Sequence, residues 1–179
     1  MKVQKCVYLW CMNLIEAKQQ FIQSWGVLGS QWGINRTMAQ VHALLLVASG
    51  PLSTDEIMEQ LSISRGNANM NIRELMNWEL VQKVIVPGDR KEYFSAEKDI
   101  WKVSMRIMYE RKKRELDPMV KVLGTITHLE GDKKDPEVKA FTETVENIKK
   151  FAGQADKMMD TMIKAEENWF WGSFLKFFK

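Results

Sequence analysis

Asparagine and arginine side chains gather between residues 64 and 77, where their chemistry suits the recognition of nucleic-acid bases. Asparagine can form two hydrogen bonds with the edge of adenine, and arginine can bind guanine or a phosphate. At about 100° per residue, Ala68, Ile72 and Leu75 share one apolar face of a helix. The opposite face then holds Asn67, Asn69, Met70, Arg73 and Asn77, with Arg65 at its N-terminal flank. An exposed helix face usually carries Lys and Glu, which favour helices more than Asn does. The composition of this face therefore indicates DNA contact rather than ordinary solvation.

Two short helices joined by a tight turn are predicted to position these side chains. The run Ser53-Thr54-Asp55-Glu56 has the form of a capping box and predicts a helix that ends near Leu61. Ser64 can cap a second helix that extends to about Glu79. The pair has the form of a helix-turn-helix, whose second helix is the one that enters the major groove of DNA.

A β-hairpin is predicted directly after the second of these helices. Residues 80–86 and 91–96 are short runs rich in Val, Ile, Tyr and Phe. The tetrapeptide Pro87-Gly88-Asp89-Arg90 between them is typical of a turn.

Further helices are predicted on both sides of this central segment. One apolar stripe runs through residues 14–33 at steps of three and four and comprises Leu14, Ala17, Phe21, Trp25, Leu28 and Trp32. A short helix is expected over residues 37–48, and a longer one from Asp99 to about Leu123 with a kink at Pro118. The last pattern has a period of about 3.5 residues and comprises Val138, Phe141, Val145, Ile148, Ala152, Ala155, Met159 and Met162. Such a seam is typical of a helix that packs on another helix, often in a second chain.

The composition agrees with a mainly α-helical globular protein and offers little for catalysis. The 179 residues include 10 Gly and 4 Pro, and 45% of them are hydrophobic. His42 and His128 fall in different predicted helices with no Cys or carboxylate at metal-ligand spacing, so both are expected to be structural. The sequence contains no glycine-rich phosphate loop and no nucleophile motif. We therefore expect no enzyme activity, no cofactor and no metal site.

The two cysteines and the C-terminal tail bear on where the protein acts. Cys6 and Cys11 form neither a disulfide framework nor a metal quartet, which favours reduced thiols in the cytoplasm. The apolar run around them is too short to span a bilayer. Residues 169–179 are rich in aromatic side chains, for which packing against a dimer partner is favoured over anchoring at a membrane surface.

Four stretches of the chain carry a resemblance to a known family. They are Trp32-Gly33-Ile34-Asn35-Arg36-Thr37, Gly50-Pro51-Leu52-Ser53, Ser64-Arg65-Gly66-Asn67-Ala68-Asn69-Met70-Asn71-Ile72-Arg73-Glu74-Leu75 and Val86-Pro87-Gly88-Asp89-Arg90-Lys91-Glu92-Tyr93-Phe94. Through them, residues 25–118 resemble the GbsR-like branch of the MarR-type winged-helix transcriptional regulators. The resemblance implies that the hairpin is a wing whose tip residue Arg90 enters the minor groove, and that the flanking helices form a dimer. It also implies that some relatives respond to choline or related osmolytes.

The sequence and the resemblance together predict a mainly α-helical winged helix-turn-helix with a small β-hairpin wing, flanked by N- and C-terminal dimerisation helices. Residues 1–33 are the expected N-terminal packing helix, residues 34–98 the DNA-binding unit, and residues 99–179 the C-terminal dimerisation region with its aromatic tail. The candidate contacts with double-stranded DNA are Ser64, Arg65, Asn67, Asn69, Met70, Arg73, Arg90 and Lys91.

A small cationic ligand such as choline is a further expectation. The chain has seven Trp, and the face of Trp is the best aromatic partner for a cation. The candidate ligand-binding residues lie at or near helix ends that border the DNA-binding unit, and they are Trp25, Trp32, Trp78 and Trp101. Because Trp25 and Trp32 also fall on the apolar stripe of the first helix, core packing is the alternative for them.

These expectations define one main function and two alternatives. The main function is sequence-specific regulation of transcription by a homodimeric repressor on a pseudo-palindromic operator. Residues 34–98 carry seven basic and eight acidic side chains, so they lack the broad positive surface of proteins that bind DNA non-specifically. A winged-helix adaptor that binds another protein and no DNA is therefore a second hypothesis. A membrane-anchored sensor is a third, and it depends only on the aromatic tail.

Overall fold

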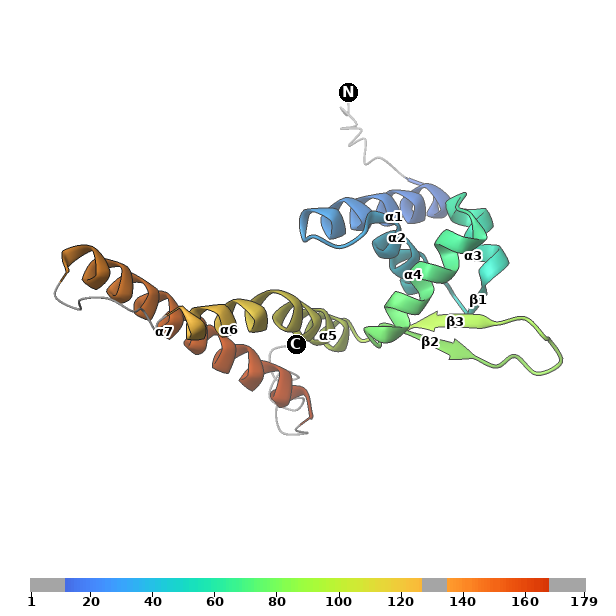
Figure 1. The fold of residues 1–179 in the computed structure, drawn as a ribbon. Helices are drawn as coiled ribbons and strands as arrows, with labels where there is room; N and C mark the ends of the chain where they lie inside the picture. Colours follow the sequence, from blue (N-terminus) through green and yellow to red (C-terminus); the bar gives the residue numbers. More distant parts are fainter. Residues whose placement is uncertain (1–11, 127–134, 168–179) are drawn as a thin grey trace, which may run out of the picture. The chain divides into compact units, whose positions relative to one another are not determined.

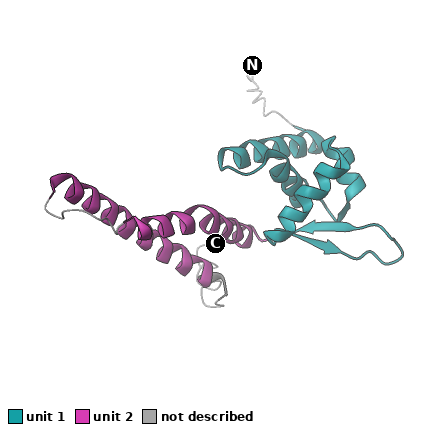
Figure 2. Ribbon diagram, in the orientation of Figure 1, with its two compact units in different colours: residues 1–98 teal, residues 99–179 magenta. Residues whose placement is uncertain are grey.

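The chain folds into two compact units, which are residues 1–98 and residues 99–179 (Figure 2). The computed structural model describes residues 12–126 and 135–167. Cys6, Cys11, His128 and the aromatic tail therefore lie outside the described residues. Among the helices of the described ranges, none is both long and apolar enough to cross a bilayer.

The first unit is a winged helix-turn-helix, as the sequence predicts. It runs through α1 (Leu14–Gln31), α2 (Arg36–Val47), β1 (Leu52–Ser53), α3 (Thr54–Leu61), α4 (Arg65–Asn77), β2 (Val81–Val84) and β3 (Tyr93–Ala96) (Figure 1). The strands form an antiparallel sheet in the order β1-β3-β2, in which Lys83 pairs with Phe94 and Ser53 pairs with Tyr93. Strands β2 and β3 are the predicted hairpin, whereas the two-residue strand β1 was not predicted.

Three serines set the ends of α3 and the start of α4, and the sequence predicts two of them, Ser53 and Ser64, as helix caps. Ser53 caps α3 in a reciprocal capping box with Glu56, and Ser64 caps α4 by accepting a hydrogen bond from a main-chain N–H. Between the two helices Ser62 adopts a left-handed φ of 52°, which ends α3. Helix α4 ends at Asn77, before the predicted Glu79, because Glu79 takes a left-handed φ of 56° that cannot continue a helix.

The core of the first unit surrounds α2, which packs against both α1 and α4. Its buried side chains come from most of the elements and include Val41, Ala43, Leu44 and Leu45 on α2, Ile57 on α3, Ile72 and Leu75 on α4, and Leu80 before β2. The predicted apolar face of α4 is therefore confirmed, and it leaves the opposite face of that helix to solvent.

Helix α1 packs on α2 through a face that its apolar stripe did not predict. The buried residues of α1 are Ile22, Gly26 and Gly29, and the exposed stripe residues are Leu14, Ala17, Leu28 and Trp32. A Cβ atom on Gly29 would lie 2.6 Å from the Cβ of Ala39 on α2, closer than two carbon atoms can pack. Because these glycines let the two backbones approach closely, α1 turns its glycine face to α2 and leaves most of the predicted stripe outside the core.

His42 lies in the middle of this core as an uncharged side chain. It is 2% exposed, and among the described residues its Nε2 atom has no hydrogen-bond partner. Nearby, the Lys98 ammonium donates to the carbonyls of Leu45, Leu46 and Ala48 at 2.7, 2.6 and 3.1 Å, which stabilises the C-terminus of α2. Burial, and next the positive charge of Lys98, lower the pKa of His42 from 6.5 to about 4.

We predict that His42 makes the first unit sensitive to mild acid. Its pKa is lower in the folded protein than in the unfolded chain, so the unfolded chain takes up the proton first as the pH falls. The free energy of unfolding should therefore decrease by about 2 kcal/mol between about pH 7 and about pH 4.5. Urea unfolding followed by tryptophan fluorescence measures the profile, and His42→Leu should flatten it. An equally steep profile in this variant would contradict the prediction.

The second unit begins with a continuous helical run that is distorted in its middle. The run consists of α5 (Ile100–Arg111), the π-helical segment η1 (Lys112–Leu116) and α6 (Asp117–Thr125), and it is followed by α7 (Pro136–Glu167). The N–H of Asp117 donates to the carbonyl of Lys112, five residues earlier, which is the π-helical pattern. Pro118 lacks an N–H, and its ring would meet the carbonyl four residues before it, so a wider turn ahead of Pro118 accommodates the proline. The predicted helix is confirmed, and its distortion begins earlier than the kink expected at Pro118.

Lys112 joins this run to α7 through Asp156 and Asp160, and it also pairs with Asp117 of the run itself. Its Nζ atom lies 2.8 Å from Asp156, 3.2 Å from Asp160 and 3.1 Å from Asp117, and its side chain is 14% exposed. The hydrogen bond with Asp156 contributes most to holding the pKa of Lys112 above its usual range. The adjoining buried apolar cluster comprises Leu123, Val145 and Ala152.

We predict that Lys112→Met lowers the free energy of unfolding by about 2 kcal/mol, because it leaves three neighbouring carboxylates without their shared cation. The matched control is Lys113→Met, which removes the same charge from an exposed neighbour and should change stability by less than about 0.5 kcal/mol. Urea unfolding followed by far-UV circular dichroism compares the two variants. Equal stability of the two would mean that the ion pairs with Lys112 contribute nothing.

The predicted seam of α7 divides between two faces of the helix. Val145 and Ala152 are buried, whereas Phe141 and Ile148 are 45% and 44% exposed. Further exposed apolar side chains on α7 are Phe151, Met158 and Met162. The apolar residues of the predicted seam therefore form two neighbouring stripes on α7. One stripe packs within the unit, and the other faces solvent.

Candidate nucleic-acid interface

Helix α4 presents the predicted side chains to solvent to different degrees. Arg65 and Arg73 are exposed, and Met70 is 60% exposed, an unusual position for an apolar side chain. Asn67 and Asn69 are half-buried. Ser64 is exposed, and its hydroxyl is engaged as the cap of the helix, accepting from the N–H of Asn67 at 3.3 Å. The outward face of α4 is thus formed as predicted, with Asn77, Met70, Arg65 and Arg73 exposed and with Asn67 and Asn69 less exposed than these.

Asn71 is a polar residue of α4 that the helical pattern did not single out. It is 3% exposed, and its Nδ2 atom donates to both the carbonyl oxygen and the side-chain Oδ1 of Asn67, at 2.8 and 2.6 Å. The signal in the sequence is the spacing of four residues between the two asparagines, which stacks them on one side of a helix. Asn71 therefore helps to hold Asn67, one of the candidate base contacts.

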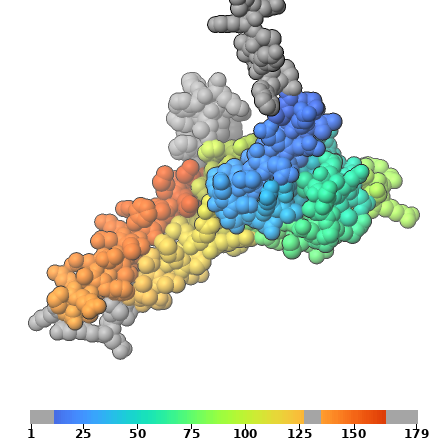
Figure 3. Space-filling model, turned by 90° about the horizontal axis from the view of Figure 1, so that it is seen from above, coloured from blue at the N-terminus to red at the C-terminus, as the bar shows by residue number. Residues whose placement is uncertain are grey.

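The tip of the wing is shaped by Asp89. Its carboxylate accepts hydrogen bonds from the N–H of Lys91 at 2.9 Å and from the hydroxyl of Tyr93 at 2.8 Å, while Gly88 supplies a left-handed φ of 86°. These bonds lower the pKa of Asp89 and raise the pKa of Tyr93. Arg90 at the tip is exposed, and the light green hairpin projects beyond the helices of the first unit (Figure 3). The wing therefore offers a cation on a short turn that is fixed from within.

The base of the wing carries an ion pair that faces α4. Lys83 on β2 is paired with Glu92, which directly precedes β3. The hydrogen bond from Lys83, and at longer range the charge of Arg73 on α4, lower the pKa of Glu92. Helix α4 and the wing therefore lie within electrostatic reach of each other.

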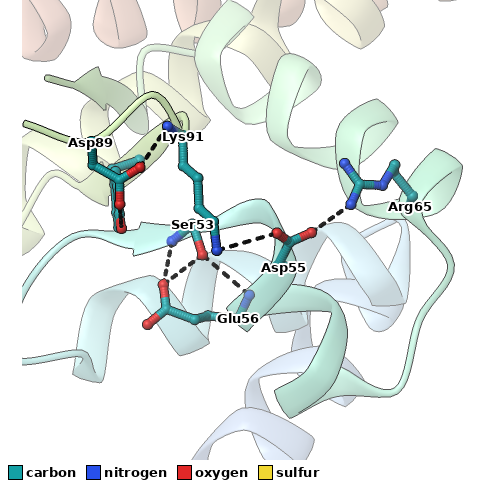
Figure 4. A network of polar contacts seen from close by, with 7 residues as sticks. Ser53, Asp55, Glu56, Arg65, Asp89 and Lys91 are labelled. Carbon is teal, nitrogen blue, oxygen red and sulfur yellow. Dashed lines mark hydrogen bonds and ion pairs between the residues drawn. The ribbon is translucent and has the colours of Figure 1, made fainter. Parts of the chain in front are cut away.

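Asp55 in the first turn of α3 forms ion pairs with both α4 and the wing (Figure 4). Its Oδ1 atom lies 2.5 Å from the guanidinium of Arg65 at the start of α4, and its Oδ2 atom lies 3.6 Å from the ammonium of Lys91 in the wing. Next to it, Glu56 accepts hydrogen bonds from Ser53, which lower the pKa of Glu56. Because the Asp55 pairs are exposed, each stabilises the fold by less than about 1 kcal/mol, so both cations can exchange Asp55 for another anion.

The four tryptophans of the candidate ligand site have different surroundings. Trp25 is half-buried, and its ring centroid lies 5.4 Å from that of Phe21 and 6.2 Å from that of His42. Trp78 is buried, and its Nε1 donates to Glu74 at 3.1 Å. Trp32 is 49% exposed at the end of α1, and Trp101 is 41% exposed in the second unit. The contacts of Trp25 and Trp78 are those of core packing.

Among the residues that the structure describes, no group of His, Cys, Asp or Glu side chains has the arrangement of a metal site. His42 in particular is surrounded by the apolar core. The polar side chains of the candidate interface are therefore exposed cations, amides and the carboxylates that pair with the cations, on α3, α4 and the wing.

Comparison with known proteins agrees with this geometry. Residues 32–92 match the family model for the MarR family. A crystal structure of a transcriptional regulator is similar to the chain at 16% sequence identity and a TM-score of 0.58, over 85% of this chain and 99% of that one. At this identity the likeness concerns the fold alone. No curated protein matches the sequence.

Proposed function

We propose that this chain, whose residues 32–92 form a MarR-family winged-helix domain, is a DNA-binding transcriptional regulator. The observation that carries the proposal is the pairing of Asp55 with Arg65 and Lys91, because it sets a cation of α4 and a cation of the wing on one surface. A duplex that meets this surface can receive α4 in its major groove and the wing in the adjacent minor groove.

The roles of the individual side chains follow from their exposure. Asn69 and Met70 on α4 would read base edges, since an amide can bond to a base and an apolar side chain can contact a thymine methyl group. Arg73 and Arg90 would neutralise phosphates or enter the minor groove. Arg65 and Lys91 would exchange the Asp55 carboxylate for phosphate oxygens, which makes part of the binding energy dependent on salt.

We further propose that the protein acts as a homodimeric repressor on a pseudo-palindromic operator. Support comes from the apolar side chains that α1 and α7 leave exposed, since single soluble domains rarely expose such rows without a partner. They include Leu14, Ile15, Val27, Leu28 and Trp32 on α1, and Phe141, Ile148, Phe151, Met158 and Met162 on α7. Two-fold symmetry would then present two α4 helices to two half-sites.

Two finer assignments start from the sequence resemblance, and the second also draws on the seven tryptophans of the chain. One is membership of the GbsR-like branch, and the other is release from DNA by a small cation such as choline. For the second, Trp32 and Trp101 are the candidates with exposed rings. A choline titration that follows operator binding and tryptophan fluorescence tests this proposal. No change in either signal at millimolar choline would contradict release by choline.

The proposed function is tested by the salt dependence of DNA binding. The probe is a set of labelled duplexes that tile the region upstream of the gene, with fluorescence anisotropy recorded at about 50 and about 200 mM salt. We predict that Arg90→Ala weakens binding to every duplex and makes the slope of log affinity against log salt shallower by about 1. Asn69→Ala should weaken binding to the preferred duplex alone, by about 1–3 kcal/mol.

In the same experiment, the variant Asp55→Asn should change DNA affinity in the opposite direction. It removes the carboxylate that pairs with Arg65 and Lys91, so it should strengthen binding to all duplexes and make the salt slope steeper by up to about 1. If the native protein binds no duplex, or if all three variants bind as it does, the regulator proposal is wrong. Absence of DNA binding would instead favour the protein-binding adaptor, which the near-neutral charge of residues 34–98 also permits.

The dimer is tested on the exposed face of α7. We predict that Ile148→Asp converts a dimer into a monomer at micromolar concentration, because the new carboxylate would be buried without a partner in the interface. The matched control is Asn147→Asp, which adds the same carboxylate at an adjacent exposed position and should leave the dimer intact. Sedimentation velocity measures both variants. A native protein that sediments as a monomer would contradict the homodimer.

A further inference from the structure

The buried side chain of Asn71 makes two hydrogen bonds to a single neighbour, Asn67. Its Nδ2 atom donates to the main-chain carbonyl oxygen of Asn67 at 2.8 Å and to the side-chain Oδ1 of Asn67 at 2.6 Å. Asn71 is 3% exposed and follows Asn67 by one helical turn on the inner side of α4. Both hydrogens of one buried amino group are therefore committed to the residue that it supports.

These two bonds fix which way round the amide of Asn67 lies. A main-chain carbonyl can only accept a hydrogen bond, so the atom of Asn71 that faces it must be nitrogen. The second hydrogen of that nitrogen must then meet an acceptor, which can only be the side-chain oxygen of Asn67. The Oδ1 of Asn67 is thus turned toward Asn71, and its Nδ2 is turned away. The orientation follows from the hydrogen-bond network, which is the proper basis for assigning an amide.

Asn67 also occupies the part of α4 where base contacts are made. It lies in the first turn of the helix, its N–H donates to the capping hydroxyl of Ser64, and its side chain is half-buried rather than enclosed. The N-terminal residues of a recognition helix are those that contact base edges in the major groove. The amino group of Asn67 is therefore the end of its amide that is left for a base.

The base edges of the major groove differ in what they offer to an amino group. Guanine presents two acceptors, N7 and O6, whereas adenine presents an acceptor beside an amino donor and cytosine presents a donor. The usual pairing of asparagine with adenine requires one donor and one acceptor from the amide. The Asn67 oxygen is turned toward Asn71, which occupies one of its two lone pairs, so the amino group is the part of the amide that meets the base, and an adenine would set its own amino group against it.

We infer that Asn71 orients Asn67 as a donor and that Asn67 thereby selects guanine at one position of each half-site. This inference rests on the proposed function, because it concerns the base that α4 reads. It differs from the adenine pairing that the sequence alone suggests for asparagine. Asn71 acts here as a positioning residue, and Asn67 as the residue that determines specificity.

The first experiment selects bound sequences from a pool of random duplexes with the native protein and with Asn67→Ala. The variant should lose the base preference at one position per half-site, and the base preferred there by the native protein should be guanine. Replacing this guanine by 7-deazaguanine removes the N7 acceptor and should weaken binding of the native protein about tenfold. The same replacement should have no further effect on Asn67→Ala, which is the matched control.

The second variant, Asn71→Leu, keeps a side chain of similar size in the core and frees the amide of Asn67 to turn. It should accept adenine and guanine about equally at that position while its thermal unfolding remains cooperative. If Asn71→Leu does not fold, the 7-deazaguanine comparison on the native protein still decides the matter. The inference is overturned if the base that depends on Asn67 is not guanine, or if a folded Asn71→Leu keeps the native ratio of guanine to adenine.

A measurement without DNA separates this inference from the proposed function. In the native protein the side-chain NH2 of Asn71 should exchange slowly with solvent by NMR, and the NH2 of Asn67 should exchange rapidly. Slow exchange at Asn67 would overturn the donor orientation even if the protein binds DNA. Failure of the native protein to bind any duplex, with the predicted exchange pattern intact, would refute the proposed function and the guanine contact while leaving the amide orientation established.

Discussion

The close packing of α1 on α2 is the constraint on which the rest of the first unit depends. Gly29 brings the α1 backbone against Ala39, and α2 is thereby covered on one side by α1 and on another by α4. The Lys98 ammonium meets the C-terminal carbonyls of α2, and burial keeps His42 on the same helix neutral. The same packing turns most of the apolar stripe of α1 outward, so a close helix contact inside the unit leaves apolar side chains exposed on its surface.

The candidate interface has few charged side chains, and most of its polar groups form hydrogen bonds or ion pairs with one another. Three cations on the α4 and wing surface are paired with carboxylates: Lys83 with Glu92, and Arg65 and Lys91 with Asp55. Such an arrangement limits attraction to any polyanion and leaves discrimination to amides and apolar side chains that are held in place. Residues 34–98 accordingly carry nearly balanced charge, with seven basic and eight acidic side chains.

The sequence predicted those features that depend on neighbouring residues. Ser53 with Glu56, Ser64, and the turn around Gly88 specify local structure by themselves, and each lies where it was expected.

The features that were missed depend on contacts between distant elements. The stripe of α1 has the right period, but which face is buried was decided by glycines that carry no apolar signal. Asn71 counts as polar in any pattern, and its burial follows from a hydrogen bond that only the folded helix provides. The π-helical turn before Pro118 likewise results from relief of a clash that a periodic pattern does not contain.

Ser53 belongs to two elements at once, since it ends β1, where it pairs with Tyr93 of β3, and it caps α3 through Glu56. Tyr93 in turn reaches Asp89 at the tip of the hairpin. A series of hydrogen bonds therefore connects the tip of the wing, through the sheet, to the first turn of α3. Tyr93 thereby contacts both the tip of the wing and the residue that caps α3, so its position is constrained from both sides.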